Sequence, residues 1–158
     1  MWNKTKSVAF SGMAIALYIV LMYFTQSISF GQYQIRLATS LYGLVYSYPF
    51  LCVPLGIANM LSNLIFGGDV VNGCFGLLAG IITTKSICLL KKFTTKKIFL
   101  VIPIAVIPSL IVPIWLSFSL NIPYHLLVCS LLVGQTITAY TCGIMVMVVA
   151  ERLDSTIV

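Results

Sequence analysis

Apolar runs long enough to cross a bilayer recur along the chain, separated by short polar breaks. Four runs are clear and cover residues 7–28, 71–90, 98–120 and 125–150. Each is close to the length of about 20 residues that a transmembrane helix needs. The first run follows Lys4 and Lys6 in the manner of a signal peptide, but no clean cleavage site follows it, so we interpret it as a retained helix.

The stretch 37–67 is too long for one upright helix and short for two full ones. It contains Pro49 and Pro54, and proline removes a backbone donor and clashes with the preceding helical turn. The residue before a proline also avoids the helical region. We therefore predict two helices, 37–48 and 50–66. The chain is then one membrane domain, residues 1–158, an all-α integral membrane protein with a six-transmembrane-helix bundle.

Charge supports this topology. Only 8% of the residues are charged, whereas a soluble globular protein carries roughly 25%. Lysines gather before the first helix and in the segment KSICLLKKFTTKK, and such clusters mark the cytoplasmic side of a membrane rather than a nucleic-acid site. Six helices place both termini and this segment in the cytoplasm. The same topology puts Arg36, Asp69 and His125 on the outer side, with Arg36 at the rim of any pocket there.

Catalytic and metal-binding patterns are lacking. The five cysteines form no C-x-x-C pair, which disfavours a disulfide framework or a zinc site. The sequence has one histidine, and it has no G-x-S-x-G, H-E-x-x-H or phosphate-binding glycine loop. We predict no enzyme activity, no metal and no cofactor in this chain. Without an ATP-binding motif, any pumping must draw on an ion gradient or on another subunit.

Polar side chains near the outer side are candidates for a pocket. Asn59 and Asn63 are four residues apart and share a helix face, Asn72 opens the next helix, and Gln135 falls near mid-bilayer. Buried amides are costly unless paired, and pairing between helices is the alternative interpretation of each one.

Two charged and two aromatic residues likewise have both a structural and a ligand-binding interpretation. Arg36 is an interfacial anchor or a ligand contact, and Asp69 is a helix N-cap, a ligand contact or both. Tyr42 and Trp115 belong to an interfacial aromatic belt or stack on a flat ring.

Small residues line one face of the first helix. Gly12 and Ala16 are four residues apart in SGMAIAL, and Ala9 lies nearby. Small residues at this spacing let another helix approach closely. This face either packs inside the bundle or docks a partner protein.

Three segments, QIRLATSLYGL, PLGIANMLSNLIFGG and DVVNGCFGLLAGIITTK, resemble the QueT/QrtT group of queuosine-precursor transporters over roughly residues 30–90. That group consists of substrate-binding S components of energy-coupling-factor (ECF) transporters. The resemblance implies an S component that captures preQ1, queuine or a related 7-deazaguanine from outside. It also implies a transmembrane coupling subunit, docked at Ala9, Gly12 and Ala16, and two cytoplasmic ATPases that use ATP.

The resemblance suggests roles for the polar residues. Asp69 would accept from the two donors on the ring edge, and Arg36, Asn63 or Asn72 would donate to its carbonyl oxygen. Asn59 and Gln135 would line the floor, and Tyr42 or Trp115 would stack on the ring.

Two positions depart from the preQ1-transporting branch of that group. Thr39 and Gln135 stand where acids are common there, which removes negative charge from the expected pocket. A stand-alone ion-coupled carrier and a structural membrane protein without a ligand remain the competing interpretations.

Overall fold

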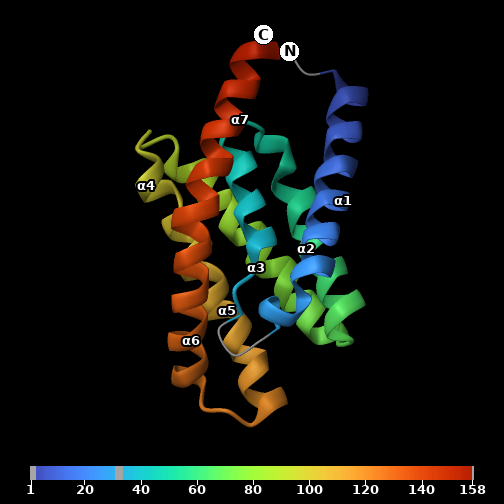
Figure 1. Cartoon of the computed structure of the whole chain (residues 1–158), viewed down its shortest axis with the longest axis vertical. Helices are drawn as coiled ribbons and strands as arrows, with labels where there is room; N and C mark the ends of the chain where they lie inside the picture. Colours follow the sequence, from blue (N-terminus) through green and yellow to red (C-terminus); the bar gives the residue numbers. More distant parts are fainter. Residues whose placement is uncertain (1–2, 31–33, 158) are drawn as a thin grey trace.

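The computed structural model describes residues 3–30 and 34–157, and within these ranges the ordered elements are all helical (Figure 1). The α-helices are α1 (Lys4–Ser29), α2 (Cys52–Gly67), α3 (Val70–Leu90), α4 (Lys97–Leu100), α5 (Ile102–Leu120), α6 (Tyr124–Thr138) and α7 (Ile144–Ile157). Two 3₁₀ segments, η1 (Leu37–Tyr46) and η2 (Pro49–Leu51), precede α2, and a π-helical turn, η3 (Ala139–Gly143), joins α6 to α7.

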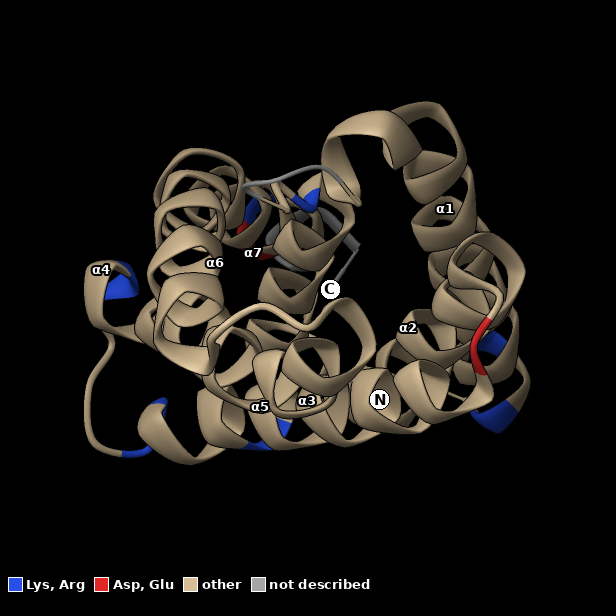
Figure 2. Cartoon of the chain, turned by 90° about the horizontal axis from the view of Figure 1, so that it is seen from below, with Lys and Arg blue, Asp and Glu red and all other residues tan. Residues whose placement is uncertain are grey.

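Among the described residues, five helical stretches are long and apolar enough to span a membrane. They are Lys4–Ser29, Pro49–Gly67, Val70–Leu90, Lys97–Leu120 and Tyr124–Leu153. Figure 2 shows how few charged residues interrupt them, and large apolar side chains such as Phe24 are well exposed on their surfaces. Exposed apolar faces of this extent suit a lipid environment. The prediction of an all-α membrane protein is confirmed.

The second predicted helix, 37–48, differs from its prediction. Leu37–Tyr46 forms a 3₁₀ helix of 10 residues, which at about 2.0 Å per residue covers only about 20 Å. That length is less than the roughly 30 Å of a bilayer's hydrocarbon core. The segment ends at Tyr46 with Ser47 as its C-cap, and Tyr48, which precedes Pro49, has left the helical region with φ −122° and ψ 78°. Five full-length spans therefore stand where six were predicted.

η1 is the central element of the bundle rather than a peripheral helix. Most of its side chains are buried, and it contacts α1, α3 and α7 (Figure 1, cyan). A Cβ added at Gly43 would lie 2.9 Å from the carbonyl oxygen of Gly143, so η1 packs directly on the backbone of η3. Runs of 3₁₀ helix longer than three or four residues are uncommon, and here packing on all sides supports the tighter winding.

Glycines bring α2 and α3 close together. A Cβ at Gly80 would lie 2.9 Å from the Cα of Gly56, and a Cβ at Gly56 would lie 2.6 Å from the Ile81 side chain. Small residues of this kind allow helix backbones to approach closely within a membrane. The close contact places Asn59 and Asn63 of α2 directly against α3.

The last two predicted helices, 98–120 and 125–150, each contain a local irregularity. Val101 separates α4 from α5, and α5 contains Pro108 and Pro113 in its interior. η3 interrupts the long helix that runs from Tyr124 to Ile157. Single π-helical turns of this type occur frequently at functional sites.

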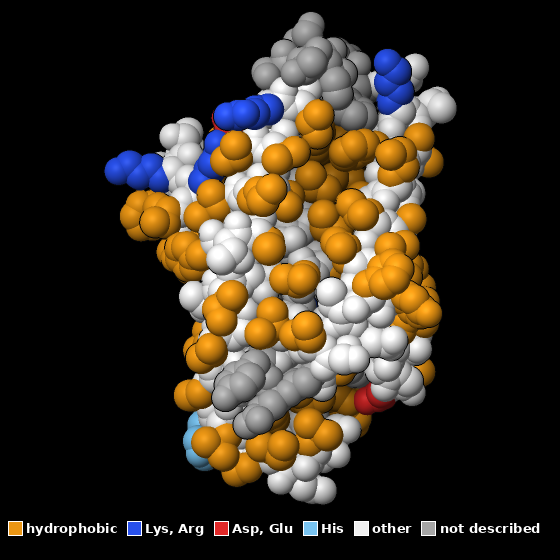
Figure 3. Space-filling view, viewed as in Figure 1, with side chains coloured by type: hydrophobic (Ala, Val, Ile, Leu, Met, Phe, Trp, Pro, Cys, Tyr) orange, Lys and Arg blue, Asp and Glu red, His pale blue; other side chains and the backbone are white. Residues whose placement is uncertain are grey.

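Both termini and the lysine-rich segment lie at one end of the molecule. Lys97 forms an ion pair with Glu151 of α7, and the Lys91 ammonium donates to the Tyr46 carbonyl at 2.6 Å. Lysine and arginine side chains gather at this end in the space-filling view (Figure 3), above a surface rich in apolar side chains. The starts of α3 and α6 lie toward the opposite end (Figure 1).

Candidate functional site

Arg36 lies inside the bundle, at the N-cap of η1, with only 4% of its surface exposed. Its Nη1 atom donates to Asn59 Oδ1 at 3.5 Å, and its guanidinium carbon is 5.1 Å from the centroid of the Phe30 ring. Its Nε atom has no hydrogen-bond partner among the described residues. The expectation of a rim position is wrong, because residues 34–36 lead the chain inward to the central η1.

Asn59 connects Arg36 to α3. Its Nδ2 atom donates to the Gly76 carbonyl at 2.8 Å, and its Oδ1 atom also accepts from Asn63 Nδ2 at 3.0 Å. Gly76 is required here because a Cβ at that position would lie 2.4 Å from Asn63 Nδ2. The two asparagines share one helix face as their spacing predicts, and Asn63 Oδ1 is left without a partner in the described part of the chain.

Thr39 and Gln135 connect η1 to α6. The Thr39 hydroxyl lies 2.6 Å from the Arg36 carbonyl oxygen and 3.0 Å from Gln135 Oε1. Gln135 Nε2 donates to the Gln34 carbonyl at 3.5 Å, and the side chain of Gln135 is 1% exposed. The two positions singled out for their missing acids therefore touch one another.

Two stacked tyrosines form the floor of this region. The rings of Tyr18 and Tyr42 are fully buried, with centroids 6.1 Å apart and planes inclined by 23°. Neither hydroxyl makes a hydrogen bond of normal geometry with any described residue. Tyr18 and Phe30 were missed in the sequence analysis, because a single aromatic residue within a long apolar helix gives no signal that separates a site from a core.

Unpaired polar atoms distinguish this cluster from an ordinary helix contact. Five buried side-chain atoms lack a hydrogen-bond partner among the described residues: Tyr18 Oη, Gln34 Oε1, Arg36 Nε, Tyr42 Oη and Asn63 Oδ1. Buried polar groups in proteins are nearly always paired. All five belong to this one connected group, which we call the Arg36 cluster. Donors and acceptors that no described residue satisfies are typical of a ligand-binding site rather than of a purely structural core.

Asp69 and Trp115 form a separate polar pair, and Asn72 follows Asp69 by three residues at the start of α3. Asp69 Oδ1 accepts from the Val71 amide at 2.9 Å, which confirms the N-cap interpretation, and Trp115 Nε1 donates to Asp69 Oδ2. No ion pair joins Asp69 to Arg36 within the described ranges. Asn72 is buried, and a Cβ at Gly67 would lie 3.3 Å from Asn72 Nδ2 and 3.6 Å from the Phe30 ring. Phe30 is therefore close both to the end of α2 at Gly67 and to Arg36.

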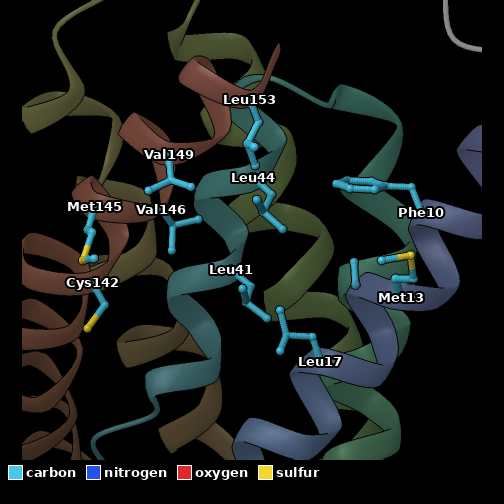
Figure 4. Close-up of a pocket in the computed structure, with 11 residues that line it drawn as sticks. Phe10, Met13, Leu17, Leu41, Leu44, Cys142, Met145, Val146, Val149 and Leu153 are labelled. Atoms are coloured by element: carbon cyan, nitrogen blue, oxygen red, sulfur yellow. The ribbon is translucent and has the colours of Figure 1, made fainter. Parts of the chain in front are cut away.

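The small residues of α1 face outward. Ala9, Gly12 and Ala16 are all exposed, and a Cβ at Gly12 would meet nothing within 4 Å. Beside them runs an apolar groove of about 500 Å³ between α1 and α7, with η1 as its floor (Figure 4). It is lined by residues such as Met13, Leu17, Leu41, Leu44, Met145 and Val149. This face does not pack inside the bundle.

Comparison with known families matches residues 8–152, nearly the whole chain, to the family described as QueT transporter. No curated protein and no solved structure matches the sequence.

Proposed function

The chain belongs to the QueT transporter family, and from this premise we propose that it captures a queuosine precursor in the Arg36 cluster. The proposed ligand is a 7-deazaguanine such as preQ1, queuine or a related base. The observation that carries the proposal is the Arg36 cluster, with its five buried polar atoms that have no hydrogen-bond partner among the described residues. A multi-pass transporter needs a polar site of this kind inside an apolar bundle, and bound ligand would pair those atoms.

The unpaired atoms match the edge of a deazaguanine. That edge carries a carbonyl oxygen as acceptor and two groups, a ring N–H and an amino group, as donors. Within the described part of the chain, Arg36 Nε is a donor without an acceptor, and Asn63 Oδ1 and Gln34 Oε1 are acceptors without a donor. A site that pairs all of these groups rejects analogues that lack them. Tyr42 then lies beneath the ring, and Asn59 and Gln135 hold the surrounding side chains in place.

Three further residues are proposed as ligand contacts nearer the entrance of the site: Asp69, Trp115 and Asn72. Each oxygen of the Asp69 carboxylate already accepts one hydrogen bond, from Trp115 or from the backbone of α3. In this proposal, only the remaining lone pairs of these oxygens accept from the ligand. Phe30 lies close to Arg36 and to the end of α2, and in this proposal it offers a ring face to the entering heterocycle.

We propose ECF-type energy coupling. A transmembrane coupling subunit would dock on Ala9, Gly12 and Ala16, and two cytoplasmic ATPases would supply the energy from ATP. The exposed small-residue face supports this, since an open glycine lets a partner helix approach closely. The lysine-rich end, with both termini, would lie in the cytoplasm.

A structural membrane protein is disfavoured by the Arg36 cluster, because buried groups in a purely structural core are expected to pair with one another. A stand-alone ion-coupled carrier usually keeps carboxylates within its spans. Here, among the carboxylates with described side chains, Asp69 is the N-cap of α3 and Glu151 lies two residues before the end of the apolar span Tyr124–Leu153. Uptake that survives deletion of the ATPase subunits would nevertheless favour the carrier.

The proposal is tested by ligand-induced thermal stabilisation of the purified chain with preQ1, queuine and guanine. Wild type is expected to respond to the 7-deazaguanines, and Arg36→Ala is expected to lose that response. Arg152→Ala, at the opposite end, serves as the matched control. An equal response of wild type and Arg36→Ala would place the ligand elsewhere.

A further inference from the structure

We propose that Cys52 and Cys88 form a redox-sensitive dithiol, which a small-molecule disulfide converts into a disulfide bond between α2 and α3. Their sulfur atoms lie 3.5 Å apart, although the two residues are 36 positions apart in sequence. The site is separate from the Arg36 cluster, and the proposal does not depend on which ligand that cluster binds. It gives the contact between α2 and α3 a covalent state in addition to the reduced one.

The packing of α2 on α3 brings the two thiols together. On α2, Gly56 follows Cys52 by about one helical turn, and on α3, Gly80 precedes Cys88 by about two turns. A Cβ added at Gly80 would lie 2.9 Å from the Cα of Gly56, so the helix backbones touch beside the thiols. The Thr84 hydroxyl also lies 3.2 Å from the Cys52 carbonyl oxygen. The sulfurs therefore meet across a fixed helix contact.

A small movement separates the reduced pair from a disulfide. The sulfur atoms would approach from 3.5 Å to the roughly 2.05 Å of a disulfide bond, and rotation of the two side chains can supply this approach. The other three cysteines are also free thiols, and in the part of the chain that the structure describes no contact joins two of their sulfurs. Cys52 and Cys88 are thus the pair that is arranged for bond formation.

The pair lies where a water-soluble reagent can reach it. Both side chains are half-buried, so neither sulfur is sealed inside the bundle. Cys52 is the first residue of α2 and Cys88 lies two residues before the end of α3. The Lys91 ammonium donates to the Tyr46 carbonyl close by, which places the pair at the lysine-rich end of the molecule.

Two exchange steps close the bond, and a disulfide R–S–S–R balances them. The thiolate of one cysteine attacks a sulfur of R–S–S–R, which forms a mixed disulfide and releases one R–S⁻. The thiolate of the second cysteine then attacks the protein sulfur of the mixed disulfide and releases the second R–S⁻. The two thiol protons pass through water to the released thiolates. Two protein thiols are oxidised, and one small disulfide is reduced to two thiols.

The bond would fasten the end of the α2–α3 contact without altering the Arg36 cluster. It closes a loop between residues 36 positions apart, and such a cross-link lowers the entropy of the unfolded chain. Asn59 follows Cys52 by seven residues, which is about 10 Å along α2. The oxidised chain is therefore expected to unfold at a higher temperature with the side chains of the cluster in place.

The experiment treats the purified full chain with oxidised glutathione, alkylates the remaining thiols and maps the peptides by mass spectrometry. A pair of peptides linked through Cys52 and Cys88 is expected, with both residues protected from alkylation. Thermal unfolding in detergent is measured in parallel, and oxidation is expected to raise the melting temperature by about 5 °C. Reduction with dithiothreitol should reverse both changes.

Cys88→Ser and Cys74→Ser are matched variants of α3. The first removes half of the pair and is expected to lose the increase in melting temperature, with Cys52 carrying a glutathione instead. The second removes an exposed thiol from the other end of the same helix and is expected to keep the increase.

Two results would overturn the proposal. One is oxidised wild type in which no peptide links Cys52 to Cys88, and the other is a linked chain that melts at or below the temperature of the reduced one. Both are measured on wild type, so they decide the matter even if Cys88→Ser does not fold. Neither result bears on ligand binding by the Arg36 cluster.

Discussion

Arg36 and Asn59 are 23 positions apart in sequence, and the guanidinium of the first donates to the side-chain oxygen of the second. That contact ties the start of the central 3₁₀ helix to the α2–α3 pair. Because Asn59 also donates to the Gly76 carbonyl, a single amide holds together three elements around the candidate site.

Asn59→Ala removes this connection. It removes the side-chain donor to the Gly76 carbonyl and leaves Asn63 Nδ2 with only the Asn59 backbone carbonyl as acceptor, so we expect a loss of about 1–3 kcal/mol in stability together with loss of ligand response. Thermal unfolding in detergent, with and without a 7-deazaguanine, measures both effects. Asn3→Ala, at an exposed position, is the control. A variant with unchanged stability would show that the amide contacts carry little energy.

Gly76→Ala and Gly12→Ala are a matched pair. At Gly76 the new methyl group would lie 2.4 Å from Asn63 Nδ2, whereas at Gly12 it would meet nothing within 4 Å. We expect the first to cost about 1–3 kcal/mol through overpacking. The second is expected to be neutral or stabilising by up to about 1 kcal/mol, because alanine favours the helix. Equal melting temperatures for the two variants would contradict the close packing of α2 on α3.

Gly12→Phe tests the proposed docking face. The exposed position should accept the ring without loss of folding or ligand binding, while uptake and co-purification with a coupling subunit should fall at least tenfold. Leu78→Phe, on the exposed surface of α3, is the control for a bulky change facing lipid. Normal uptake by Gly12→Phe would exclude this face as the docking surface.

Asp69 and Trp115 are expected to act as a unit. Asp69→Ala removes a helix cap worth about 0.5–2 kcal/mol and also the acceptor for Trp115 Nε1. Trp115→Phe removes only the donor. In a double-mutant cycle, the stability losses should therefore be non-additive. The same proteins test the ligand role, since an Asp69→Ala variant that responds to ligand as wild type does would remove Asp69 from the site.

The orientation of the chain in the membrane can be measured by labelling single cysteines that are introduced into a cysteine-free variant. Lys92→Cys lies in the lysine-rich segment and Ser119→Cys lies near the end of α5. With the lysines in the cytoplasm, an impermeant thiol reagent added to intact cells should modify only Ser119→Cys. The reverse pattern would overturn the proposed direction of capture.

The spans of 20 or more apolar residues could be predicted because their length and composition alone select a helix in lipid. The shared face of Asn59 and Asn63 followed from helical spacing. The 3₁₀ winding of η1 could not be predicted, because a mostly apolar stretch of ten residues shortly before a proline looks like part of a span, and only packing against α1, α3 and α7 decides its geometry.

The burial of Arg36 was missed for a related reason. A charged residue beside an apolar run is normally an interfacial anchor. Arg36 is buried instead because η1, which it precedes, lies at the centre of the bundle. Tyr18, Phe30 and the contact between Thr39 and Gln135 join elements far apart in sequence, which no local pattern reports.

The contact between Gly43 and Gly143 sets a tightly wound segment against a loosely wound one. Gln135 lies four residues before η3 on the same long helix, and its Oε1 atom is 3.0 Å from the Thr39 hydroxyl of η1. The last long helix therefore holds η1 at two points, one through polar side chains and one through bare backbone.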